Sequence, residues 1–156
     1  MSTPTNPSHQ IEVLLVEDNV ADLLLMMKFL KESSVQSRIN VARDGQMAMD
    51  YLNRVNGFEN AVRPDLVLLD LGLPYKDGHE VLGEIKQNIN LSAIPIIILT
   101  SSNSPQDAID SYIEKADYYM VKPHDLKQYA ASMKYLEDFW LKTLLGFKNY
   151  SGSGRL

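Results

Sequence analysis

Short apolar runs alternate with longer segments of helical period along most of the chain. Runs rich in leucine or β-branched residues predict five strands, over residues 11–16, 38–42, 65–70, 96–100 and 118–121. Apolar positions at helical spacing predict the intervening helices, over 21–32, 45–54, 79–87, 105–114 and from 125 to about 145. This alternation is typical of repeated βα units, in which helices cover both faces of a parallel sheet.

Five βα units predict an α/β fold, a flavodoxin-like (βα)5 three-layer sandwich. Right-handed crossovers favour the parallel strand order 2-1-3-4-5, with the reversal of direction between the first and third strands. Ligands of such sheets bind beside that reversal, at the carboxyl ends of the strands. We therefore expect the functional site to lie just after residues 16 and 70.

One domain accounts for most of the 156 residues, a length that suits a single core. Residues 1–10 contain two prolines and several polar residues and are expected to form a flexible leader. Residues 11–147 are predicted to form the domain, including an extended last helix. Residues 148–156, which end in SGSGRL, are expected to form a flexible tail.

Composition and charge argue against several classes of function. The net charge is −5 and the basic residues are scattered, which argues against a nucleic-acid partner. Cysteine is absent, so disulfides and thiolate metal sites are excluded. Apolar runs stay far below the roughly 18 residues that span a bilayer, and the polar N-terminus lacks a secretory segment. We expect a cytoplasmic protein that has no membrane partner.

Three carboxylates are expected to meet at the predicted site. Glu17 and Asp18 follow the first strand, and Asp70 closes the third. Like charges this close are unfavourable unless a cation lies between them or protons are retained. A divalent metal resolves the conflict, and an all-oxygen donor set favours Mg²⁺. We expect Asp18 and Asp70 as direct ligands, with the backbone carbonyl of Gly72, and Glu17 acting through a water. Taken alone, Glu17 and Asp18 are better explained as caps of the following helix, where carboxylates complement the helix dipole.

Two further residues change this balance. Thr100 ends the fourth predicted strand and Lys122 follows the fifth, so a hydroxyl and an ammonium join the acids. Singly, each is more often a strand terminator or a surface residue. Together with the acids they indicate phosphoryl transfer, in which Asp70 is the nucleophile, Mg²⁺ neutralises charge, and Thr100 and Lys122 hold the phosphoryl oxygens. A carboxylate is already ionised at neutral pH, so this reaction needs no histidine base.

The motifs that carry these residues resemble the receiver domain of two-component response regulators. They are VEDN at 16–19, LLDLGLPYKDG at 68–78, LTS at 99–101 and VKP at 121–123. The resemblance covers residues 11 to about 136. It implies that Asp70 is the phosphoacceptor and receives the phosphoryl group from the phosphohistidine of a sensor histidine kinase.

The same resemblance assigns the remaining site residues. It implies that Glu17 and Asp18 form the acidic pair, and that the phosphoryl group is bound by Thr100, Ser101 and Lys122. Thr100 and Tyr119 would form the switch, which changes a protein-interaction surface when the phosphoryl group is present. An ordinary half-buried strand aromatic is the alternative for Tyr119, and Tyr118 could exchange roles with it if the strand register differed by one residue.

A narrower resemblance points to a class of partner. The long loop at 56–64, the DLGLPYKDG segment and the aromatic pair at 139–140 resemble single-domain regulators that partner bacterial phytochromes. This implies that the sensor kinase is a phytochrome.

The apolar spacing of the last predicted helix continues past the usual end of a receiver. Phe139, Trp140 and Leu144 would then be exposed in a monomer, and we expect them to form the interface of a two-fold homodimer. The alternative is that the extension folds back and covers the edge of the sheet.

Two rival functions share parts of the pattern. A flavodoxin-like FMN carrier needs a loop rich in serine, threonine or glycine after the first strand, whereas EDNVAD is acidic here. An aspartyl-phosphate phosphatase usually has a second aspartate two residues after its nucleophile, and Gly72 occupies that position.

Overall fold

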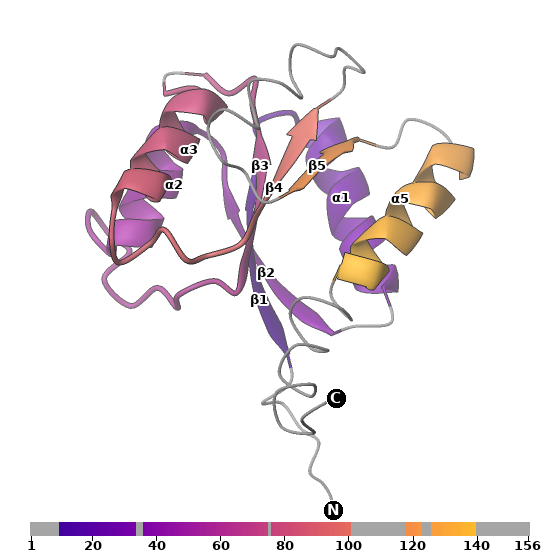
Figure 1. The fold of residues 1–156 in the computed structure, drawn as a ribbon, viewed down its shortest axis with the longest axis horizontal. Helices are drawn as coiled ribbons and strands as arrows, with labels where there is room; N and C mark the ends of the chain where they lie inside the picture. Colours follow the sequence, from indigo (N-terminus) through magenta and orange to yellow (C-terminus); the bar gives the residue numbers. More distant parts are fainter. Residues whose placement is uncertain (1–9, 34–35, 75, 101–117, 123–125, 140–156) are drawn as a thin grey trace, which may run out of the picture.

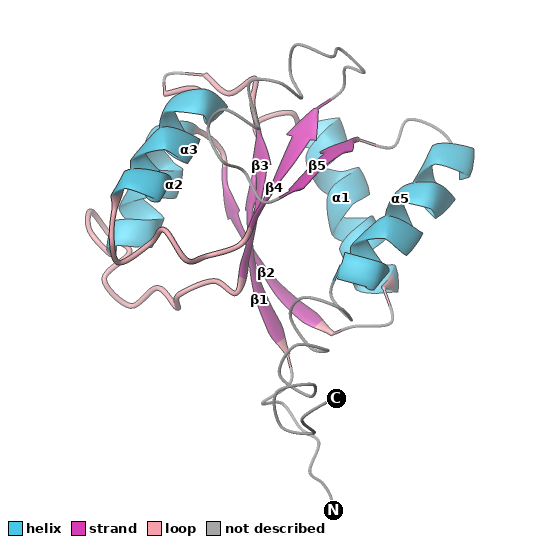
Figure 2. Cartoon of the chain, viewed as in Figure 1, coloured by secondary structure: helices cyan, strands magenta, loops and turns pink. Residues whose placement is uncertain are grey.

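The computed structural model describes residues 10–33, 36–74, 76–100, 118–122 and 126–139 (Figures 1 and 2). Its sheet has five parallel strands in the order β2-β1-β3-β4-β5, as predicted. The strands are β1 (Ile11–Val16), β2 (Ser37–Ala42), β3 (Leu66–Asp70), β4 (Ile96–Thr100) and β5 (Tyr118–Val121). The pattern of apolar runs therefore located every strand to within one residue at each end.

Four helices are described, and they cover both faces of the sheet. They are α1 (Val20–Glu32), α2 (Gly45–Asn53), α3 (Gly78–Gln87) and α5 (Leu126–Phe139). Helices α1 and α5 lie on one face, and α2 and α3 lie on the other (Figure 1). The helix expected over 105–114 lies outside the described residues. Within the described ranges, no helix has both the length and the apolar character needed to cross a membrane.

Two hydrophobic clusters hold the layers together, and the central strands contribute to both. In β1, Leu14 and Val16 belong to the cluster beneath α2 and α3, whereas Val13 and Leu15 belong to the cluster beneath α1 and α5. Successive side chains of a strand point to opposite faces, so a strand that is covered on both sides must be apolar at nearly every position. This is why β1, β3 and β4 read as nearly continuous apolar runs, whereas β2, at the edge of the sheet, does not.

The described end of α5 is buried against the sheet, which corrects one expectation. Phe139 is only 5% exposed and belongs to the cluster that includes Leu136. Its ring lies edge-on to Tyr118, with 4.4 Å between the ring centroids. Exposure of Phe139 in a monomer was therefore the wrong prediction, because a residue three positions after Leu136 lies on the same face of the helix. Trp140 and Leu144 lie outside the described residues.

Two glycines of α3 have opposite surroundings and provide a test of the packing. A Cβ atom on Gly78 would lie 2.4 Å from Leu71 Cα and 2.5 Å from the carbonyl oxygen of Asp70, whereas one on Gly83 would meet nothing within 4 Å. Gly78→Ala should lower the free energy of unfolding by about 2–3 kcal/mol, because the backbone after Asp70 must move. Gly83→Ala should raise it by about 0.5–1 kcal/mol, through higher helix propensity. Urea unfolding measures both, and equal effects of the two substitutions would contradict the packing described.

Candidate functional site

The three predicted carboxylates meet at the carboxyl ends of β1 and β3. These strands are paired so that Val16 lies opposite Leu69, which places Glu17 and Asp70 at the same edge of the sheet. Carboxylate oxygens of Glu17, Asp18 and Asp70 all lie within 4.8 Å of one another. The predicted convergence of side chains more than 50 residues apart in the sequence is thus present.

Neither Glu17 nor Asp18 is the cap of the following helix. Asn19 is the residue that caps α1, and its Oδ1 atom accepts a hydrogen bond of 2.9 Å from the backbone N–H of Asp22. Glu17 Oε2 accepts a weaker bond, of 3.2 Å, from the N–H of Asn19. A cap needs one side-chain acceptor at this position, and Asn19 supplies it. The capping interpretation therefore does not account for the two acids.

Lys122 brings a buried positive charge to the same place from β5. The residue is 5% exposed, and its Nζ atom lies 2.8 Å from both Glu17 Oε1 and Asp22 Oδ2. Asp70 Oδ2 lies 3.5 Å from the same Nζ atom. The ammonium therefore contacts two members of the acidic cluster and one carboxylate outside it.

Asp22 is the residue that the sequence analysis missed. It lies four positions after Asp18, in the first turn of α1, and it donates its backbone N–H to Asn19. The available signal was an acidic residue in the first turn of the helix that directly follows Glu17 and Asp18. The signal is weak, because acidic residues are common in first turns, where they complement the helix dipole.

The pKa values of Glu17 and Lys122 are both raised, which favours the neutral form of the acid and the charged form of the base. Burial raises the pKa of Glu17 to about 7; the charge of Asp70 adds to this rise, and Lys122 opposes it. Burial by itself lowers the pKa of Lys122, but the carboxylates of Asp22, Glu17 and Asp70 together raise it above its ordinary value. Lys122 therefore stays positively charged, whereas Glu17 titrates near neutral pH.

The residues present fit a small divalent cation. Glu17 Oε1 is buried and, among the described residues, has no donor in hydrogen-bond geometry, although the Lys122 ammonium lies close to it. Oxygen ligands about 2.1 Å from Mg²⁺ lie at most about 4.2 Å apart, only slightly less than the 4.8 Å limit found here. Gly72 is adjacent, and its N–H donates to Asp70 Oδ1 at 3.3 Å. The donor set is entirely oxygen, which suits Mg²⁺ or Mn²⁺.

The structure describes the other predicted site residues only in part. Thr100 ends β4 and is paired with Val121 of β5, which puts its backbone at the same edge as Asp70; its side chain lies outside the described part. Ser101 lies outside it too. Tyr119 is half-buried against the cluster beneath α2 and α3. Tyr118 lies on the opposite face of β5, against Phe139, so the two tyrosines do not share a position.

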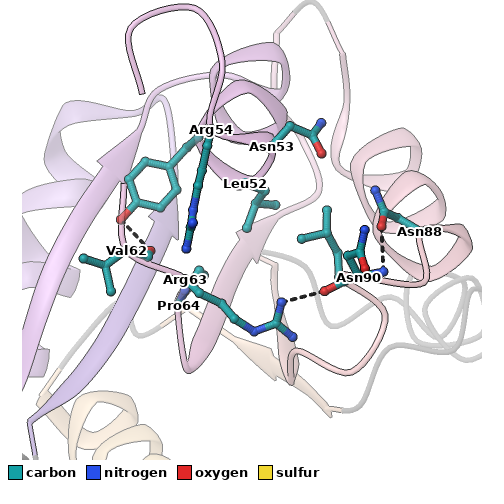
Figure 3. Close-up of a pocket in the computed structure, with 10 residues that line it drawn as sticks. Leu52, Asn53, Arg54, Val62, Arg63, Pro64, Asn88 and Asn90 are labelled. Carbon is teal, nitrogen blue, oxygen red and sulfur yellow. Dashed lines mark hydrogen bonds between the residues drawn. The ribbon is translucent and has the colours of Figure 1, made fainter. Parts of the chain in front are cut away.

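A second hollow lies at the opposite edge of the sheet and has different chemistry. It has a volume of about 360 Å³ and lies before the first residues of β3 and β4 (Figure 3). Arg63 Nη1 donates a bond of 2.5 Å to the carbonyl oxygen of Asn90 across one side. None of the ten residues that line it is acidic: Tyr51, Leu52, Asn53, Arg54, Val62, Arg63, Pro64, Asn88, Asn90 and Leu91. This hollow is therefore separate from the acidic site and lacks carboxylate ligands for a metal.

Comparison with protein families identifies the family to which the chain belongs. The family model of the response regulator receiver domain matches residues 13–134, which include the acidic cluster and Lys122. The chain belongs to this family. The protein is a response-regulator receiver, and the family resemblance of its motifs is confirmed.

Individual relatives are similar over nearly the whole receiver. The response regulator Rcp1 of Synechocystis sp. is 44% identical over 144 residues, which are 92% of this chain and 97% of the relative. A crystal structure of the Mn²⁺-bound form of Rcp1 has a TM-score of 0.77 at 43% identity, covering 86% of this chain and 96% of that one. The phosphorylated cyanobacterial phytochrome response regulator RcpA has a TM-score of 0.78 at 42% identity, with the same coverage. The first of these structures holds a metal ion and the second is phosphorylated, and both have the same fold as this chain.

The raised pKa of Glu17 predicts a specific pH dependence in the metal-free receiver. Because the folded pKa lies above the ordinary value of 4.5, protonated Glu17 stabilises the fold. This stability is fully present below about pH 4.5 and is lost as the pH rises through about 7. Relative to Glu17→Gln, the free energy of unfolding of the wild type in EDTA should fall by on the order of 2 kcal/mol between about pH 5 and pH 8. Parallel pH profiles of the two proteins, measured by urea unfolding, would contradict the assignment.

Proposed function

We propose that this receiver accepts a phosphoryl group on Asp70 from the phosphohistidine of a sensor histidine kinase. The observation that carries the proposal is the cluster of Glu17, Asp18 and Asp70 against the buried ammonium of Lys122. Mg²⁺ is the proposed cofactor, held by Asp18, Asp70 and the backbone carbonyl of Gly72, with Glu17 acting through a water. When bound, the ion supplies positive charge that lowers the repulsion between the carboxylates and the incoming phosphoryl oxygens.

The proposed reaction needs no proton transfer within the receiver. A carboxylate oxygen of Asp70 bonds to phosphorus, the phosphorus–nitrogen bond breaks, and its electron pair returns to the donor's imidazole. Asp70 Oδ1 accepts the N–H of Gly72 and Asp70 Oδ2 lies 3.5 Å from Lys122 Nζ, so both oxygens have a donor or cation beside them. These contacts fix the rotation of the carboxylate and support its role as an oriented nucleophile.

Further residues are proposed to bind the transferred group and to transmit its presence. Thr100, Ser101 and Lys122 bind the phosphoryl oxygens in this proposal, and Thr100 and Tyr119 form the switch. The half-buried position of Tyr119 in β5 is compatible with a ring that has two packing arrangements. We also propose that the receiver assists its own phosphorylation and dephosphorylation.

The kinase and the cellular setting are proposed from the relatives. RcpA is described as a cyanobacterial phytochrome response regulator, and it shares 42% of its residues with this receiver over most of both chains. A bacterial phytochrome with histidine kinase activity is therefore the proposed phosphoryl donor. We propose that the receiver acts in the cytoplasm.

Intact mass spectrometry tests the acceptor. Wild-type protein incubated with acetyl phosphate and Mg²⁺ should gain about 80 Da, the mass of one phosphoryl group, and Asp70→Asn should gain nothing. Asp50→Asn is the matched control, because Asp50 lies on α2 and, among the residues that the structure describes, its side chain accepts a hydrogen bond from Gln46 alone. The control should be phosphorylated like the wild type. Equal labelling of Asp70→Asn would contradict the proposal, as would labelling of the wild type that persists unchanged in EDTA.

A homodimer through the end of the last helix is a separate proposal. Its proposed interface residues are Trp140 and Leu144. Phe139, which the sequence analysis also placed there, is buried within its own chain, so substituting it would disturb the core. The combined Trp140→Ala and Leu144→Ala variant is therefore the cleaner probe, and it should sediment as a monomer where the wild type sediments as a dimer. A monomeric wild type, or a variant that remains dimeric, would refute this interface.

A further inference from the structure

Asp22 holds the buried lysine from outside the acidic cluster. Its Oδ2 atom accepts a hydrogen bond of 2.8 Å from Lys122 Nζ, which joins the first turn of α1 to the residue after β5. The backbone of Asp22 is fixed by its N–H bond to the Asn19 cap. The side chain of Asp22 is 30% exposed, whereas the side chain of Lys122 is 6% exposed. One end of this ion pair is therefore buried and the other reaches the surface.

The other two carboxylate partners of Lys122 are residues that would also bind a metal ion. Its ammonium lies 2.8 Å from Glu17 and 3.5 Å from Asp70, and both belong to the cluster that suits a divalent cation. An ammonium and a metal ion compete for the same carboxylate oxygens, because each neutralises the same charge. Among the ion pairs of the described residues, Asp22 is the only carboxylate partner of Lys122 that lies outside that cluster.

We propose that Asp22 is a positioning residue, which retains the Lys122 ammonium beside the site and so leaves Glu17 and Asp70 available to a divalent cation. The proposal rests on the proposed function in that it takes the acidic cluster to be the metal site. Asp22 acts only through Lys122 and is not a metal ligand.

The energetic argument follows from the burial of Lys122. A buried ammonium without a partner is costly, so it keeps a carboxylate contact in every state of the site. With Asp22 present, a cation that takes over Glu17 and Asp70 still leaves the lysine one charged partner. Without the Asp22 carboxylate, a metal ion that binds Glu17 and Asp70 takes away the remaining carboxylate contacts of Lys122. Asp22 should therefore raise the affinity of the site for a divalent cation.

A double-mutant cycle separates this effect from simple loss of charge. We would titrate Mg²⁺ by isothermal calorimetry into four proteins: wild type, Asp22→Asn, Lys122→Gln and the double variant. Asp22→Asn should weaken Mg²⁺ binding by roughly tenfold in the wild-type background, the low end for a charged hydrogen bond, because Asp22 is partly exposed. In the Lys122→Gln background the same substitution should change the affinity by less than about twofold.

Each possible result has a meaning. An equal loss in both backgrounds would show that Asp22 acts by its charge alone and would overturn the proposal, as would an unchanged affinity of the single variant. A wild type that binds no Mg²⁺ would instead contradict the proposed function. Asp22→Ser, whose side chain is too short to reach the lysine, provides a second variant if Asp22→Asn does not fold. Thermal melts in EDTA check the folding of each protein.

A matched control removes a carboxylate at the same edge of the sheet. Asp44 caps α2 through its Oδ1 atom, which accepts from the N–H of Met47, and it has no ion pair with Lys122. Asparagine caps helices as well as aspartate does, so Asp44→Asn retains the fold. Its Mg²⁺ affinity should stay within about twofold of the wild type. A loss as large as that of Asp22→Asn would mean that the site responds to any lost charge nearby, which contradicts a specific role for Asp22.

Discussion

Repulsion between carboxylates at one edge of the sheet is the constraint around which the site is built. Glu17 is fully buried, Asp70 is nearly so, and both lie within reach of Asp18. Buried like charges are tolerated only where an opposite charge faces them or where a proton is retained. The molecule uses both means, because Lys122 supplies the opposite charge and the pKa of Glu17 is raised to about 7. The carboxylates of the site thus outnumber its positive charges, so binding of a cation would reduce their repulsion.

The apolar core determines where these charges lie. Each central strand is buried on both faces and supplies two separate clusters from alternate residues. A shift of one residue in register would exchange the two faces of a strand and disrupt both clusters, so the register is strongly fixed. Asp70 is the last residue of β3, and Glu17 directly follows β1. The position of the charged groups is therefore a consequence of hydrophobic packing, which supplies the free energy that their burial costs.

The parts of this structure that could be predicted from the sequence are those that local pattern determines. Apolar runs located the strands, the βα alternation predicted their order, and the position of each acid at a strand end predicted the cluster. Asp22 was missed because its partner is 100 residues away and a lone aspartate in a first helical turn has an ordinary explanation. The close approach of Gly78 to the backbone after Asp70 was equally invisible, since it depends on how α3 packs against the loop.

The error over Phe139 has a related cause. The apolar spacing of the last helix continues past the usual end of a receiver, which predicts that the residues beyond that end are exposed. The same spacing carries Leu136 and Phe139 on one face, and the structure places both in the core with Tyr118 against the ring. Periodicity thus identified the buried face correctly, but it contains no information about how far the neighbouring strand and helix extend to cover it. Such contacts between distant segments are the part that a single sequence leaves undetermined.

The charge balance of the site also explains why its lysine needs more than one partner. Three carboxylates, those of Glu17, Asp22 and Asp70, contact the Lys122 ammonium, and the carboxylate of Asp18 lies beside those of Glu17 and Asp70. In the proposed reaction a divalent cation offsets two of these charges, and the phosphoryl group then adds negative charge again. The surroundings of Lys122 are therefore anionic before and after transfer, so its ammonium is attracted to the site throughout. What changes is the set of oxygens that compete for it, and the contact with Asp22, on a different element from the cluster, keeps the lysine in place while that set changes.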